Sequence, residues 1–256
     1  MLQNQAKIIS LVPSWTETLL ECGVNVVART RFCIHPAQRV QNIPVVGGTK
    51  NLKIEEIIKL QPDFVILDQE ENKKEMADEL QRHGIEMIVS HVTSLQSAAQ
   101  FLAELALRLK NEDLQILADR YQRLIESKKR LSSELFFQNS LIQSLGHQNA
   151  VIDQENLCYV IWKDPYMVIG EETFISDVFS MLKLRLHAPD AKYPQMEESE
   201  LKKYFCLFSS EPYPFEKEFA ALSRQGFKSA LIDGEKISWY GIRNIKFLES
   251  CLAEPQ

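Results

Sequence analysis

The sequence predicts an α/β protein made of two α/β lobes joined by one long helix. Three observations support this. Apolar runs of strand type alternate with helical segments over the first 110 residues, a stretch of about 23 residues then shows only helical periodicity, and the alternation afterwards resumes. Strands separated by helices and short turns imply parallel sheets with right-handed crossovers. We therefore expect an N-terminal lobe over 1–110, a linking helix over 111–136 and a C-terminal lobe over 137–256.

The first lobe begins with a strand over 8–12, because five apolar or small residues precede Pro13. Ser14-Trp15-Thr16-Glu17 fits a capping box, which predicts a helix that runs to Cys22 and ends at Gly23. Asn72 is the expected cap of a later helix, and Gly84 its end. The other expected elements are strands at 24–28, 43–46, 64–67 and 86–89 and helices at 54–60, 72–83 and 94–108.

The linking helix is predicted by leucines and a tyrosine at three- and four-residue steps between 114 and 135. Asn111 can cap it, and Glu112 and Asp113 suit the positive end of its dipole. Such a helix would be roughly 35 Å long. It could pass from one lobe to the other, or it could be a long surface helix within one domain.

The second lobe alternates less regularly. We expect strands at 159–162, 207–209 and 229–232 and helices at 175–184, 215–224 and 242–252.

Composition excludes several classes of function. The net charge of −6 and the lack of a basic run argue against nucleic acid or an anionic membrane as the main partner. No stretch approaches the ~18 apolar residues of a membrane span. The N-terminus has no basic and apolar pattern of a secretory signal, and the five scattered cysteines suit reduced thiols. We therefore expect a cytoplasmic protein without membrane insertion.

Recognised catalytic and metal motifs are missing. There is no phosphate-binding glycine loop, no G-x-S-x-G elbow and no Cys/His cluster of zinc type. We therefore expect no enzyme, although carboxylates and His35 in one cleft would be acid/base candidates for an enzymatic alternative, namely Glu70, Glu71, Glu171 and Glu211.

The three tryptophans indicate a ligand site. Trp15, Trp162 and Trp239 each lie where a strand-like run gives way to a loop or helix. In open α/β sheets, ligands bind beyond the carboxyl ends of strands. Each tryptophan could instead fill a local core beneath a loop.

Polar loops accompany them. Acidic loops follow two strands, at 68–72 and 209–215, and a third, at 170–173, precedes a helix that its charges could simply stabilise. His35 could brace its own loop or contact a ligand. Arg31 and Arg243 could pair with the acidic loops or meet an anionic ligand group. Together these residues favour a ligand with an apolar body and polar edges.

The chain resembles the helical-backbone substrate-binding proteins of ABC transporters, which capture cobalamin, haem and ferric siderophores. The resemblance rests on IISLVPSWTE at 8–17, on GGTKNLKIEEI at 47–57 with LQPDFVI at 60–66, and on 166–184. It covers nearly the whole chain. It implies two Rossmann-like α/β lobes, a single rigid helix between them and a ligand cleft between the lobes.

The resemblance also implies the ligand-binding residues and the partners. A corrinoid, haem or metal chelate is the expected ligand, no resident cofactor or bound metal ion is expected, and ABC-transporter subunits are the implied partners. A cytosolic ligand sensor that uses the same cleft is the further alternative. The expected ligand-binding residues are Ser14, Trp15, Arg31, Phe32, His35, Gly48, Thr49, Glu70, Glu71, Trp162, Glu171, Glu211, Trp239, Tyr240 and Arg243.

Overall fold

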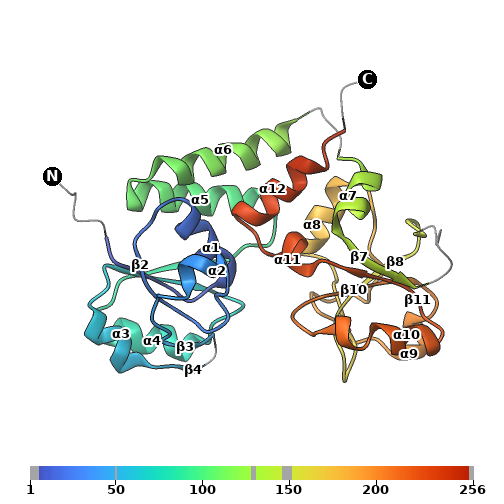
Figure 1. Cartoon of the computed structure of the whole chain (residues 1–256), viewed down its shortest axis with the longest axis horizontal. Coiled ribbons are helices and arrows are strands. Elements are labelled where there is room, and N and C mark those ends of the chain that lie inside the picture. The colour runs from blue at the N-terminus through green and yellow to red at the C-terminus, as the bar shows by residue number, and fades with distance from the viewer. Residues whose placement is uncertain (1–5, 50, 128–130, 146–151, 254–256) are drawn as a thin grey trace. The chain divides into compact units, whose positions relative to one another are not determined.

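The computed structural model describes residues 6–49, 51–127, 131–145 and 152–253. The chain forms two compact units (Figure 1). The first contains the chain up to Val92, Gln96–Arg123 and Tyr240–Ile245. The second contains Thr93–Leu95, Leu124–Trp239 and the chain from Lys246 onward. The mixed α/β class expected from the sequence is confirmed.

The first unit is built on a parallel sheet of four strands in the order β2-β1-β5-β6. In register, Ile9 faces Val65 and Leu67 faces Val89. The order places β1 and β5 at the centre, where both are almost fully buried. The bounds are β1(Ile8–Ser10), β2(Val26–Arg29), β5(Phe64–Asp68) and β6(Met87–Ser90), with a small hairpin of β3(Gly47–Gly48) and β4(Asn51–Leu52).

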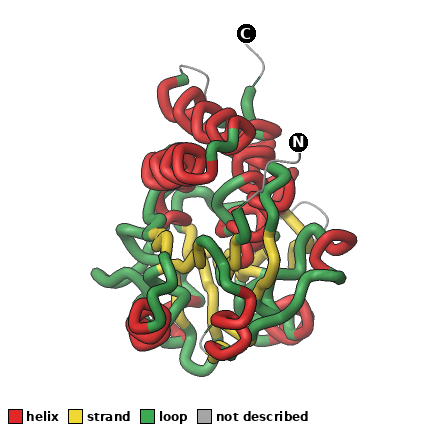
Figure 2. The backbone as a smooth tube through the Cα atoms, turned by 90° about the vertical axis from the view of Figure 1, so that its left-hand side faces the viewer, coloured by secondary structure: helices red, strands yellow, loops and turns green. Residues whose placement is uncertain are grey.

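Helices cover both faces of this sheet (Figures 1 and 2). Alternate strand residues such as Ile9 and Val65 pack with Ile57 and Leu80 in one apolar core, on the side of α3 and α4. On the other side α5 and α6 run side by side, and Gln96 donates to Gln122 across them (3.3 Å). The helices are α1(Pro13–Glu21), α2(Ala37–Val40), α3(Ile54–Leu60), α4(Lys74–Arg82), α5(Leu95–Leu109) and α6(Glu112–Glu126).

The second unit has a five-stranded sheet in the order β7-β11-β10-β8-β9. Its three central strands are parallel, and the two edge strands are antiparallel to their neighbours. One face packs on a core that includes Phe208 and Phe219, and Tyr159 on the other face meets Phe179. The strands are β7(Leu141–Leu145), β8(Leu157–Trp162), β9(Met167–Val168), β10(Phe205–Ser209) and β11(Lys228–Ile232). The helices are α7(Ser133–Ser140), α8(Phe174–Met181), α9(Glu198–Leu201), η1(Phe215–Lys217), α10(Phe219–Arg224) and α11(Gly234–Ser238). The last helix, α12(Ile242–Ser250), begins in the first unit and continues in the second from Lys246.

The single helix expected over 112–135 is wrong. α6 ends at Glu126, and a new helix, α7, begins after Ser132. The Ser132 hydroxyl accepts from the Leu135 amide (3.2 Å), which is a side-chain cap that a continuous helix would not need. Leu131 forms a bridge with Leu252 instead of a helical turn. The spaced apolar residues up to Leu124 belong to α6 and Leu135 belongs to α7, while Leu131 lies between the two helices.

Two helix starts also differ from the expectation. Val12 caps α1 without a side-chain bond, and Pro13 occupies the first turn, so the capping box at Ser14 is wrong. α4 begins at Lys74 after Lys73, and Asn72 instead accepts from the Asp68 amide (2.8 Å). Only Val45 of the strand expected at 43–46 pairs, in a bridge with Arg29, and the local strands are those of the hairpin.

Candidate functional site

A chain of buried hydrogen bonds lies at the carboxyl end of the first unit's sheet. The Trp15 indole donates to Ser90 (3.0 Å), and Ser90 donates to Asp68 (2.7 Å). Tyr240 donates to the same Asp68 carboxylate (3.0 Å). Burial, together with the nearby charges of Glu71 and Asp68, raises the pKa of Tyr240 well above its usual value. The tyrosine is therefore a neutral donor, and Asp68 is the acceptor on which this network depends.

Trp15 belongs to the core of the first unit. Its side chain is completely buried, with the rings of Phe101 and Tyr240 each 4.8 Å from it. Ser14, beside it on α1, is also buried. Of the interpretations left open by the sequence, the structure places Trp15 as a local core residue whose polar edge is satisfied by Ser90.

The segment Tyr240–Ile245 is fastened to the first unit by polar contacts. The Tyr121 hydroxyl accepts from the Gly241 amide (2.9 Å), and Thr18 accepts from the Ile242 amide (3.0 Å). Gly241 has φ +97°, and a Cβ there would lie 2.2 Å from the Thr18 hydroxyl. Arg243 forms a two-pronged ion pair with Glu17 (2.7 and 2.8 Å). Arg243 thus pairs with an α1 carboxylate rather than with one of the acidic loops.

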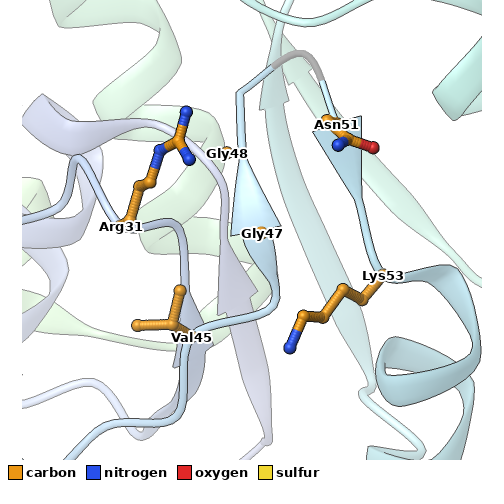
Figure 3. A pocket seen from close by; sticks show the side chains of 6 residues that line it. All are labelled: Arg31, Val45, Gly47, Gly48, Asn51 and Lys53. Carbon is orange, nitrogen blue, oxygen red and sulfur yellow. The ribbon is translucent and has the colours of Figure 1, made fainter.

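A small cavity of about 300 Å³ opens beside the β3–β4 hairpin of the first unit (Figure 3). It is lined by Arg31, Val45, Gly47, Gly48, Asn51 and Lys53. The Arg31 amide donates to the Gly47 carbonyl (2.9 Å), which ties the strand-following loop to the hairpin. Gly47 has φ +119°, and a Cβ there would lie 2.3 Å from the Asn51 carbonyl oxygen. The hairpin therefore requires glycine at its first position.

The structure brings together three of the predicted residues at this cavity. The Arg31 guanidinium lies 4.9 Å from the Phe32 ring centre, and Phe32 is 46% exposed. Gly48 backs both side chains, since a Cβ there would lie 3.2 Å from Phe32 and 3.5 Å from Arg31. The sequence singled out Arg31 and Gly48 but missed Val45, Asn51 and Lys53, which line the same cavity.

Other predicted residues of the first unit lie in its loops. Glu70 and His91 form an exposed pair with 3.4 Å between Oε1 and Nε2. The Glu71 amide donates to Asp68 (3.3 Å), and the Thr49 carbonyl accepts from Asn72 (3.0 Å). His35 is half-buried in the loop before α2. These contacts brace the loop that follows β5 and join it to the residue after β6 and to the hairpin.

In the second unit, Glu211 and Trp239 meet. The Glu211 carboxylate follows β10 and accepts from the Trp239 indole (2.7 Å) and the Ser238 hydroxyl (2.9 Å). Burial raises the pKa of Glu211, and these two hydrogen bonds offset part of the effect. Trp239 is 9% exposed, so it is packed rather than displayed. The Glu211 carboxylate therefore serves as a buried hydrogen-bond acceptor for Ser238 and Trp239.

Trp162 is the displayed aromatic residue of the second unit. It is 42% exposed and meets the Tyr213 ring edge to face, with centres 5.6 Å apart. The Tyr213 hydroxyl and the Lys163 ammonium both bond to Glu218. The hydrogen bonds from Lys163 and Tyr213 lower the pKa of Glu218, and the same bonds raise the pKa of Lys163 and the pKa of Tyr213. Trp162 therefore packs against Tyr213, whose position is fixed by hydrogen bonds with Glu218 that the sequence did not reveal.

Glu171 stands apart from these clusters in the structure. It is exposed in the loop before α8, and the cap of that helix is Thr173, which exchanges hydrogen bonds with Ser176. Helix-start charge was the simpler interpretation of this loop, and here the helix has a complete side-chain cap of its own.

Metal-binding side-chain groups and membrane-spanning helices were both sought in the described part of the chain. Its His, Cys, Asp and Glu side chains form no group of three placed to bind a metal ion. None of its helices combines the length and the apolar character needed to cross a membrane.

Comparison with known proteins identifies relatives along most of the chain. A vitamin B12-binding protein of Vibrio campbellii is 23% identical over 210 residues, which cover 80% of this chain and 70% of the relative. The periplasmic vitamin B12-binding protein BtuF of Vibrio cholerae superimposes with a TM-score of 0.69 at 20% identity, covering 96% of this chain and 95% of that one. The haem-binding protein RhuT of Roseiflexus gives 0.72 at 16% identity, with coverage of 96% and 95%.

These likenesses establish the fold, and a family model settles the membership. The model described as periplasmic binding protein matches residues 8–204, which include β1, the hairpin, β5 and the strands up to β9. The resemblance noted in the sequence is thereby confirmed, and the chain belongs to the periplasmic binding protein family.

Proposed function

We propose that this protein binds a bulky small molecule of corrinoid, tetrapyrrole or metal-chelate type and presents it to an ABC transporter. Membership of a binding-protein family over residues 8–204 is the observation that carries the proposal. Relatives that bind vitamin B12 and haem support this chemical class of ligand. The family and these relatives are binding proteins, which favours binding over the enzymatic alternative.

The carboxyl ends of the strands are the proposed contact surfaces within each unit. In the first unit, Phe32 and Arg31 lie exposed beside the hairpin cavity. In the second unit, Trp162 presents an exposed ring supported by Tyr213. Exposed aromatic faces and a few charged groups suit a ligand with a flat apolar body and polar edges.

The test is a titration of the purified protein with cobalamin, iron protoporphyrin and a ferric siderophore. Binding is followed by the ligand's own absorbance, so that tryptophan variants are read in the same way as the wild type. We expect saturable binding of at least one ligand. Trp162→Ala should weaken it by about tenfold, which corresponds to a stacking loss of about 1.4 kcal/mol.

A matched control separates stacking from general damage. Trp162→Phe keeps an aromatic ring at the same place and should retain most of the affinity, whereas Trp162→Ala should not. A folded protein that binds no member of the panel would refute the proposed ligand class.

The cytoplasmic location remains a prediction from the sequence. It conflicts with the transporter partner, because the binding proteins of importers work outside the cytoplasmic membrane. Cell fractionation of the native protein decides between a transporter component and a cytoplasmic binding protein or sensor.

A further inference from the structure

The hairpin cavity of the first unit combines two cations with a volume too small for a whole tetrapyrrole. Arg31 and Lys53 both line it, and its volume is about 300 Å³. Pockets that enclose an entire drug-sized ligand run from about 300 to 1,000 Å³, so this cavity is at the lower limit, and a tetrapyrrole is larger than most drug-sized ligands. The cavity therefore suits one substituent of a large ligand, and its charge suits an anionic one.

Arg31 is the stronger of the two candidate anion-binding groups. Its side chain is exposed, and its guanidinium stacks over the Phe32 ring. Within the described residues, no carboxylate forms an ion pair with it. Stacking on an aromatic face leaves the edges of a guanidinium free to donate. A planar fork of N–H donors matches the two oxygens of a carboxylate.

Lys53 adds positive charge from the opposite side. Figure 3 shows Arg31 beside Gly48, while Lys53 extends from the end of β4 beneath Gly47. The Lys53 ammonium is 3.1 Å from Glu56, but both side chains are about half exposed. Such a surface pair is weak and can rearrange when a ligand carboxylate arrives.

We infer that this cavity, formed by Arg31, Lys53 and the Gly47–Gly48 strand, binds a carboxylate-type anionic substituent of the ligand. The inference rests on the proposed function and deepens it, because it separates the candidate ligands. Iron protoporphyrin carries two carboxylates at one edge, whereas cobalamin has no carboxylate: its ring side chains are amides, and its one anionic group is the phosphodiester of its nucleotide loop. The protein should therefore prefer an anionic, carboxylated ligand.

The experiment compares variants and ligands in a cycle. Wild type, Arg31→Gln and Lys53→Gln are titrated with iron protoporphyrin, with its dimethyl ester and with cobalamin at fixed ionic strength. Arg82→Gln is the matched control, because it removes the same charge from an exposed position of α4 in the same unit. Melting temperatures confirm that each variant folds.

We expect Arg31→Gln to lower the affinity for iron protoporphyrin by about tenfold or more and to leave the affinity for its dimethyl ester almost unchanged. Lys53→Gln should have a smaller effect of the same kind, and Arg82→Gln none. Gly48→Ala should also weaken binding of the acid form, because its methyl group would lie 3.2 Å from the Phe32 ring on which Arg31 stacks and would displace that ring. Equal affinities of wild type and Arg31→Gln for the acid form would overturn the inference while leaving the proposed function intact.

A second arm does not depend on the large ligand. Inorganic phosphate and glutarate are added to each protein, with sodium chloride at matched ionic strength as the reference. If the cavity takes free anions, they should raise the melting temperature of the wild type and of Arg82→Gln but not that of Arg31→Gln. If no large ligand binds and no anion discriminates between the variants, the proposed function and the anion site both fail.

Discussion

The two units treat the carboxyl ends of their strands in opposite ways. In the first unit, Trp15 follows β1 and is completely buried beneath Phe101 and Tyr240. In the second unit, Trp162 ends β8 and leaves 42% of its surface exposed. The same residue type at a comparable point of a strand is a core component in one unit and a displayed surface in the other. Position along a strand therefore does not decide exposure; the residues that pack against the ring do.

The buried carboxylates of the two units differ in the groups that donate hydrogen bonds to them. Asp68 accepts from Ser90 and Tyr240 and also from the amides of its own turn at Glu70 and Glu71. Glu211 accepts from the side chains of Ser238 and Trp239, and burial raises its pKa. A carboxylate with backbone donors is part of a folded turn, whereas one supported by side chains in a buried place is poised to take up a proton.

The largest expected effect concerns the buried tryptophan. Trp15→Ala should cost about 3–5 kcal/mol of the unfolding free energy of the first unit, because it opens a cavity and leaves Ser90 without its donor. Trp162→Ala should cost about 1 kcal/mol or less in the second unit. Peptide-level hydrogen exchange measures each unit separately. Similar losses of unfolding free energy in the two units would contradict the distinction between a buried and an exposed tryptophan.

Removal of the Asp68 acceptor should have the next largest effect. Asp68→Ala removes the acceptor of the Tyr240 hydroxyl and the nearer of two acceptors of Ser90, whose hydroxyl also lies 3.1 Å from the Leu67 carbonyl. It should destabilise the first unit by about 2–3 kcal/mol. Tyr240→Phe removes only one donor, so about 1 kcal/mol is expected. Chemical unfolding of the two variants gives the difference, and a larger loss in Tyr240→Phe would contradict the central role of Asp68.

Glu211 should make the stability of the second unit depend on pH. Because its pKa in the folded protein is raised above the ordinary 4.5, the folded state holds this proton to higher pH than the unfolded state does. The resulting stabilisation is complete below about pH 4.5 and is lost as the pH rises through the raised pKa.

Glu211→Gln removes this titration. Its unfolding free energy relative to wild type should therefore increase as the pH rises from 4 to 7, which parallel denaturation series at several pH values measure. A pH-independent difference between Glu211→Gln and wild type would show that the Glu211 pKa is ordinary.

The smallest effect sharpens the contrast between the tryptophans. Acrylamide should quench mainly the fluorescence of Trp162, since Trp15 is inaccessible and Trp239 is only 9% exposed. Trp162→Phe should remove most of the quenchable emission with little change in stability. Unchanged quenching in that variant would place the accessible tryptophan elsewhere.

Local patterns predicted much of the fold and little of the side-chain environment. Helix 54–60 was placed at the bounds that α3 has, because its apolar period and the Pro62 turn are both local. The break after α6 was missed because Leu131 pairs with Leu252, more than a hundred residues away. The burial of Trp15 similarly depends on residues 90, 101 and 240. Arg31 and Gly48 were found because their loop motif is local, whereas Lys53 lies across a hairpin.

The attachment of Tyr240–Ile245 to the first unit has a consequence for synthesis. Domains commonly fold in order as the ribosome releases them. Here Tyr240, Gly241, Ile242 and Arg243, which bond to Asp68, Tyr121, Thr18 and Glu17, are synthesised only after β11 of the second unit. The first unit must therefore wait, with these groups still hydrated, until residues 240–245 have been synthesised. Its completion and that of the second unit fall at nearly the same moment.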